Sequence, residues 1–133
     1  MNAVDTNILV RFLKGDDPNQ AEVACSVFAS GGVWIAKTVL LETHWVLGGY
    51  DMDPESIRAA FVELLGLENV VVEDAPAVAA ALALTDDGID FADALHLCSR
   101  PAGTAFISFD RRLIKGAQRC GLKDVLHPTV TKP

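Results

Sequence analysis

The chain has few cysteines and no long apolar run. Its three cysteines, Cys25, Cys98 and Cys120, are odd in number and widely spaced, so they fit neither a disulfide framework nor a zinc motif. We expect three reduced thiols, with Cys25 and Cys98 in packing positions. No stretch of about 18 apolar residues is present, so no membrane span is expected. No basic segment followed by an apolar run opens the sequence, and we therefore expect a cytoplasmic protein without a secretory signal.

Basic residues are scarce as well. The sequence has 11 Lys and Arg against 18 Asp and Glu, a net charge of −7, which argues against a simple nucleic-acid binder. The charge is unevenly distributed, because residues 1–99 carry a net −12 and residues 100–133 a net +5. A polyanion could dock on this basic end. Equally, its Lys and Arg side chains could merely solvate a surface.

The order of apolar and polar segments predicts one α/β domain over residues 1–133. This length is typical of a single domain, and half of the residues are apolar, enough for a continuous core. Short apolar runs alternate with helical patterns, which indicates a layered fold with a largely parallel sheet. No Gly-x-Gly-x-x-Gly follows the first expected strand, so a dinucleotide-binding function is disfavoured.

The expected elements follow from periodicity and from Gly and Pro breaks. Strands are expected at residues 3–4, 33–35, 70–72, 105–107 and 125–126. Helices are expected at residues 8–13, 19–29, 38–47, 54–65, 75–84 and 90–99, with a short helix after Asp110.

Four aspartates stand at or just after the point where a helix is expected to begin. Asp5 and Asp110 each follow an apolar strand, and in open α/β sheets ligands bind outside the carboxyl ends of the strands. The alternative is that each aspartate is a helix N-cap. Asp93 shares a helix face with Asp90, and the same alternative makes Asp90 the N-cap and Asp93 the acid in the first turn.

Glu42 is the acid that structure alone explains least. Its helical neighbours Val39, Trp45 and Val46 are apolar, which predicts a buried carboxylate without a partner. A bare buried charge costs on the order of several kcal/mol, so such an acid is usually functional.

Together, Asp5, Glu42, Asp93 and Asp110 suggest a metal centre. Carboxylates that a fold brings together repel one another unless they are protonated or bound to a cation. Mg²⁺ and Mn²⁺ prefer such an all-oxygen set of ligands. Metals held in this way beside phosphates catalyse phosphoryl transfer.

These segments resemble a known family. The run Val4–Leu9, the acid Glu42, the run Asp90–Leu97 and the run Ile107–Asp110 resemble the PIN-domain ribonucleases, and among them the VapC-type toxins of bacterial toxin–antitoxin pairs. The resemblance covers the whole chain, and the motifs follow the family's order. It implies a three-layer α/β/α PIN-like sandwich with a mostly parallel central sheet. It also implies a Mg²⁺- or Mn²⁺-dependent endoribonuclease.

The resemblance also implies roles for individual residues. The acidic metal-site and catalytic residues would be Asp5, Glu42, Asp93 and Asp110. The supporting polar residues would be Asn7, Asp90 and Ser108. Phosphates of the RNA would contact basic residues of the C-terminal quarter, for which the candidates are Arg111, Arg112, Lys115 and Arg119. The implied partners are a structured RNA such as transfer or ribosomal RNA, a small antitoxin protein and a second copy of the chain.

Two other functions remain open. A phosphoryl-transfer or phospho-acceptor domain also uses acids at strand ends, although no Asp-x-Asp follows the first expected strand. A catalytically inactive PIN-like interaction module is disfavoured because all four acids are present.

Overall fold

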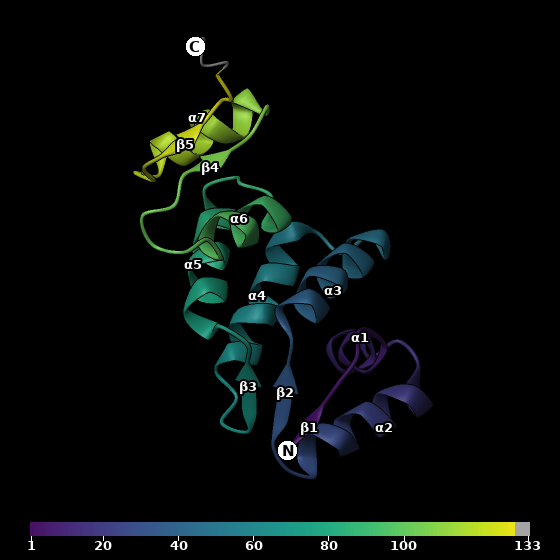
Figure 1. Cartoon of the computed structure of the whole chain (residues 1–133). Helices are drawn as coiled ribbons and strands as arrows, with labels where there is room; N and C mark the ends of the chain where they lie inside the picture. The colour runs from purple at the N-terminus through teal and green to yellow at the C-terminus, as the bar shows by residue number, and fades with distance from the viewer. Residues whose placement is uncertain (130–133) are drawn as a thin grey trace. The chain divides into compact units, whose positions relative to one another are not determined.

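In the computed structural model, which describes residues 1–129, helices alternate with short parallel strands (Figure 1). The strands are β1 Asn2–Ala3, β2 Val33–Ile35, β3 Val70–Val72, β4 Phe106–Ile107 and β5 Val125–Leu126. The helices are α1 Thr6–Lys14, α2 Pro18–Ala29, α3 Lys37–Gly49, α4 Pro54–Leu65, α5 Ala75–Asp86, α6 Phe91–Cys98 and α7 Arg111–Arg119. The chain forms two compact units, Met1–Ala79 and the residues from Ala80 onward, which we describe separately.

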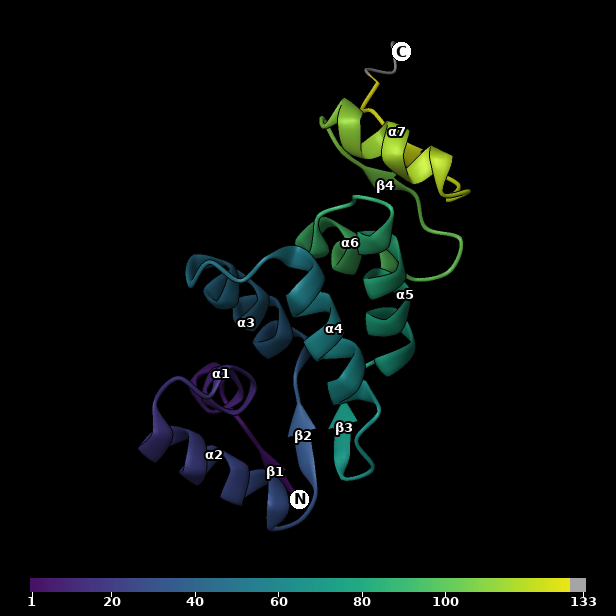
Figure 2. The same ribbon diagram turned by 180° about the vertical axis from the view of Figure 1, so that it is seen from behind.

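The first unit is built on a parallel three-stranded sheet in the order β1-β2-β3 (Figures 1 and 2). Ala3 pairs with Trp34 across β1 and β2, and Trp34 pairs with Val71 across β2 and β3. Because the strands are parallel and follow chain order, helices α1 and α2 connect the first pair and α3 and α4 the second. The carboxyl ends of all three strands therefore meet at one edge of the sheet, where α/β proteins bind their ligands.

The core of this unit forms around the central strand β2. Val33 and Ile35, which point to the same face of the sheet, are fully buried, and Trp34 between them is half-buried. Helix α1 packs against both α2 and α3. The rings of Phe12 on α1 and Phe28 on α2 stack with centroids 3.8 Å apart. Burial of these apolar side chains fixes the helices that flank the strand ends.

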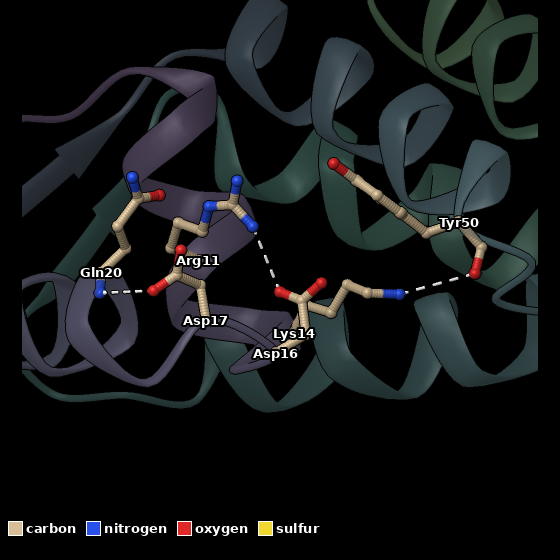
Figure 3. A network of polar contacts seen from close by, with 6 residues as sticks. All are labelled: Arg11, Lys14, Asp16, Asp17, Gln20 and Tyr50. Atoms are coloured by element: carbon tan, nitrogen blue, oxygen red, sulfur yellow. Dashed lines mark hydrogen bonds and ion pairs between the residues drawn. The ribbon is translucent and has the colours of Figure 1, made fainter.

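Polar contacts set the turn between α1 and α2 (Figure 3). Gly15 ends α1 in the left-handed region, at a φ of 66°, which a glycine adopts at no steric cost. Asp17 caps α2 by accepting a hydrogen bond from the backbone N–H of Gln20 at 3.2 Å. Nη1 of Arg11 lies 3.2 Å from Oδ1 of Asp16. The first helix, expected to end at residue 13, therefore ends at Lys14, just before Gly15.

The last residue of α1 also reaches the end of α3 (Figure 3). Lys14 donates from Nζ to the backbone carbonyl of Tyr50 at 3.5 Å, and the same ammonium lies 4.5 Å from the centroid of the Tyr50 ring. A cation over an aromatic face adds a modest attraction at a partly exposed position.

The second unit contains a parallel pair of strands, β4 and β5, connected by α7. Phe106 pairs with Val125, and Ile107 pairs with Leu126. Helix α7 packs against β5 and buries Leu113, Ile114, Gly116 and Ala117. The opposite side of α7 is therefore left for polar residues.

Arg100 binds backbone of its own unit. Its guanidinium donates to the carbonyl oxygens of Thr104, Lys123 and Asp124 at 3.0, 2.8 and 3.1 Å, respectively. These bonds join the loop before β4 to the segment before β5. Arg100 is thus a structural member of the basic C-terminal end.

The sequence-based element assignment is confirmed in kind and in order. The ends of the elements differ by one or a few residues, as where β4 begins at Phe106 and α5 continues to Asp86. The α/β class with parallel strands is confirmed as well. The single domain over residues 1–133 stays a prediction.

Candidate functional site

Asp5 stands at the carboxyl edge of the sheet of the first unit. It follows β1 and is the N-cap of α1, where Oδ1 accepts a hydrogen bond from the backbone N–H of Ile8 at 3.0 Å. Asp5 is therefore a helix N-cap, as the alternative interpretation predicts. The capping bond uses only Oδ1, and a carboxylate has a second oxygen, so capping and cation binding are compatible roles. Asn7, in the first turn of α1, is exposed.

The predicted burial of Glu42 is wrong, since the side chain is exposed. Helix α3 instead buries Leu40, Thr43 and Leu47, which recur at helical spacing. Glu42 and Trp45 lie away from this face, and Trp45 is 79% exposed. The error came from taking Trp45 as a core residue. Burial therefore gives no support for a functional role of Glu42, and such support has to come from its contacts.

Thr6 is a neighbour of Glu42 that the sequence analysis missed. Thr6 is the first residue of α1, and its hydroxyl donates a hydrogen bond to Oε1 of Glu42 on α3. Thirty-six residues separate the two along the chain. The only signal in the sequence was the run Asp5-Thr6-Asn7, which holds more capping residues than one helix start requires.

The helix that carries Glu42 is capped from the neighbouring strand. Ala36 stands at the N-cap of α3 and offers no side-chain acceptor. Oε1 of Glu73, which follows β3, accepts a hydrogen bond from the backbone N–H of Lys37 at 2.9 Å instead. Lys37 Nζ in turn lies 3.1 Å from Oδ2 of Asp74. The start of α3 is thereby attached to the carboxyl edge of the sheet.

The second unit holds the other candidate acids at two helix starts. Asp90 caps α6 by accepting from the backbone N–H of Ala92 at 3.1 Å, and Asp93 lies in the first turn of that helix. Asp110 caps α7 by accepting from the backbone N–H of Leu113 at 3.1 Å.

Ser108 acts on the backbone before α7. Its Oγ accepts a hydrogen bond from the backbone N–H of Asp110 at 3.0 Å. The hydroxyl therefore shapes the turn that presents Asp110, which is consistent with the supporting role expected for it.

The carboxyl group of Asp93 is electrostatically strained. Burial raises its pKa above the usual value, and the negative charges of Asp90 and Asp110 raise it further, while His96 opposes them. A carboxyl group whose pKa is raised by burial and by neighbouring acids is often found at a functional site. A bound cation would offset this repulsion, and carboxylate oxygens are ligands that Mg²⁺ and Mn²⁺ prefer.

The cysteines show no sign of thiolate chemistry. Burial raises the pKa of the Cys98 thiol, and burial followed by the charge of Asp87 raises that of Cys120. All three cysteines are free thiols. The expected packing position of Cys25 is wrong, since Cys25 lies on the exposed side of α2, whose buried residues are Ala24 and Phe28.

The candidate acids thus form two groups. Asp5 and Glu42 belong to the first unit and are connected through Thr6. Asp90, Asp93 and Asp110 belong to the second unit and interact electrostatically. Within residues 1–129, no three His, Cys, Asp or Glu side chains lie close enough together to hold a metal.

Comparison with known proteins identifies the family. The family model of the PIN domain matches residues 3–118, a range that includes every candidate acid. The chain belongs to the PIN-domain family. PIN domains are generally metal-dependent nucleases and typically use Mg²⁺ or Mn²⁺. The PIN-like α/β fold expected from the sequence is thereby confirmed.

Two further findings complete the comparison. No curated protein matches the chain. In the part of this PIN domain that the structure describes, none of the helices combines the length and apolar character that a membrane span requires.

The strain at Asp93 predicts a pH-dependent stability. The raised pKa means that the folded chain binds this proton more tightly than the unfolded chain. The ionised Asp93 carboxylate therefore lowers the stability of the folded chain. This loss of stability develops as the pH rises through the ordinary and then the raised pKa, and it is fully present above both. Without metal, Asp93→Asn should be more stable than the wild-type chain at pH 7, and this gain should vanish below the ordinary pKa of an aspartate.

Denaturant unfolding in a chelator at several pH values measures this difference. Glu63→Gln, which changes an exposed acid on α4, is the matched control and should show no comparable gain. An Asp93→Asn variant that is less stable than wild type at pH 7 would contradict the prediction.

Proposed function

We propose that this PIN domain is a metal-dependent endoribonuclease, the toxin of a toxin–antitoxin pair, which hydrolyses phosphodiester bonds in structured RNA such as transfer or ribosomal RNA. The observation that carries the proposal is the match to the PIN-domain family over residues 3–118, a range that contains Asp5, Glu42, Asp93 and Asp110. The negative charges of Asp90 and Asp110, which raise the pKa of Asp93, would be offset by a bound divalent cation.

Asp5, Glu42, Asp93 and Asp110 are the proposed metal-binding and catalytic residues. Their oxygens suit Mg²⁺ or Mn²⁺, and Asn7, Asp90 and Ser108 are the proposed supporting residues. A cation bound there would polarise the scissile phosphate and lower the pKa of water for attack on it. The chain's own contribution is to present the acids on helix starts, where capping bonds restrict Asp5, Asp90 and Asp110.

Removal of one acid should abolish cleavage without unfolding the chain. Asp5→Asn and Asp93→Asn should each lower the rate of RNA cleavage by at least about 100-fold, because the charge that holds the metal is lost. Asparagine is as good an N-cap as aspartate, so α1 should remain intact in Asp5→Asn. Cleavage by the wild-type chain should stop in a chelator and return with Mn²⁺.

The matched control for Asp5→Asn is Asp53→Asn. Asp53 caps α4 and accepts from the backbone N–H of Ser56 at 2.7 Å, so it shares the capping role but is not a candidate acid. Asp53→Asn should cleave RNA at the wild-type rate. Full activity of Asp5→Asn or Asp93→Asn, measured on gels with labelled RNA, would refute the assignment.

The exposed side of α7 supports RNA binding next to a site acid. Asp110 caps this helix, and the basic row begins at the following residue. The row consists of the exposed residues Arg111, Arg112, Lys115 and Arg119. Positive charge beside the scissile bond would attract RNA phosphates to an otherwise acidic chain.

Arg112→Ala and Arg119→Ala should weaken RNA binding and its salt dependence. Removing one cation that binds a phosphate should reduce the slope of log affinity against log salt by about 1. Lys123→Ala is the matched control, because Lys123 is basic and exposed but lies outside α7. Titrations at several salt concentrations with catalytically inactive Asp93→Asn as the parent protein measure the slope. An unchanged slope in both α7 variants would exclude α7 as the RNA-binding face.

The proposed protein partners are a second copy of the chain and a small antitoxin. An antitoxin that places a basic side chain among the acids would replace the metal, since a cation of either kind relieves their repulsion. Light scattering should give twice the 14.2 kDa of one chain, and co-expression with a small adjacent reading frame should yield an inhibited complex. A chain that stays monomeric up to high micromolar concentration would contradict the dimer.

A further inference from the structure

The hydrogen bond from Thr6 to Glu42 connects the two candidate acids of the first unit. Asp5 is the N-cap of α1, and Thr6 is the next residue. The Thr6 hydroxyl donates to Oε1 of Glu42 on α3. The direction is unambiguous when Glu42 is charged, because a carboxylate only accepts. The backbone that places Asp5 thus also places the group that holds Glu42.

We propose that Thr6 is a positioning residue, which holds the Glu42 carboxylate in the orientation required for metal binding. This inference rests on the proposed nuclease function. Glu42 is exposed, and an exposed glutamate samples many rotamers. A bond to one of its oxygens restricts that freedom and leaves the other oxygen for a cation. Residues that orient metal ligands in this way contribute strongly to metal affinity.

Both ends of the bond are fixed to the core, so the bond can restrain the glutamate. Helix α1 buries Leu9 and Val10 below Thr6, and α3 buries Leu40 and Leu47 on either side of Glu42. Thr6 is β-branched, which limits its own rotation. The two helices also pack directly against each other. The hydroxyl is therefore held at a fixed place rather than following Glu42 as it moves.

The test separates the hydroxyl of Thr6 from its shape. Thr6→Val removes the hydroxyl and keeps the branched shape, whereas Thr6→Ser keeps the hydroxyl and loses a methyl group. Thr38→Val is the matched control, because Thr38 is an exposed threonine on α3, one turn before Glu42. Calorimetric titration with Mn²⁺ alone measures metal affinity, and cleavage of bulk transfer RNA gives kcat and KM.

Thr6→Val should weaken Mn²⁺ binding about 10- to 100-fold and lower kcat, with KM for RNA little changed. Thr6→Ser and Thr38→Val should stay within about twofold of the wild-type chain, the scatter expected where the orienting group is retained. If Thr6→Val unfolds below the assay temperature, Thr6→Ala takes its place, because alanine favours the helix.

A double-variant comparison distinguishes positioning from general stabilisation. If Thr6 acts through Glu42, adding Thr6→Val to Glu42→Gln should not weaken Mn²⁺ binding further. Unchanged affinity in Thr6→Val alone, or an equal loss in the Glu42→Gln background, would overturn the inference and leave the nuclease proposal standing. Failure of the wild-type chain to bind Mn²⁺ and cleave RNA would instead refute the proposed function.

Discussion

Capping hydrogen bonds at helix starts fix the positions of three of the candidate acids. Asp5, Asp90 and Asp110 each accept from an N–H group in the first turn of a helix. Such a bond satisfies a backbone donor that the helix leaves unpaired, and it places negative charge at the positive end of the helix dipole. The same bond that starts each helix therefore also fixes an acid relative to rigid backbone.

The acids outside the caps depend on their neighbours. Burial and the negative charges of Asp90 and Asp110 raise the pKa of the Asp93 carboxyl group. Glu42 is exposed and is held by the hydroxyl of Thr6 on another helix. The start of α3 is in turn capped by Glu73 from the end of β3. The pair Asp90 and Asp93 follows from local helical spacing, but the other contacts bring together residues from different elements and follow from no local sequence pattern.

Much of the fold could be predicted because the signals are local. The break at Gly15 and the start of α4 at Asp53 and Pro54 arise from backbone geometry that the residue types themselves dictate. The side of α3 that is buried was misjudged for the opposite reason. The apolar residues of α3 come in two consecutive runs, Val39–Leu41 and Trp45–Leu47, which spread around the helix. Periodicity alone therefore could not decide that Leu40 and Leu47 face the core while Trp45 is exposed. Packing against the neighbouring elements decided it.

The sequence by itself determined the parallel α/β class, the order of its elements, the capping aspartates and the resemblance to the PIN-domain family. These properties depend on residue type and short spacing. Only the tertiary structure decided that Glu42 is exposed, that Thr6 holds it and that Arg100 donates to backbone carbonyl groups of its own unit. The physical reason is that a hydrogen bond across 36 residues depends on where two helices pack, and packing is a property of the whole core.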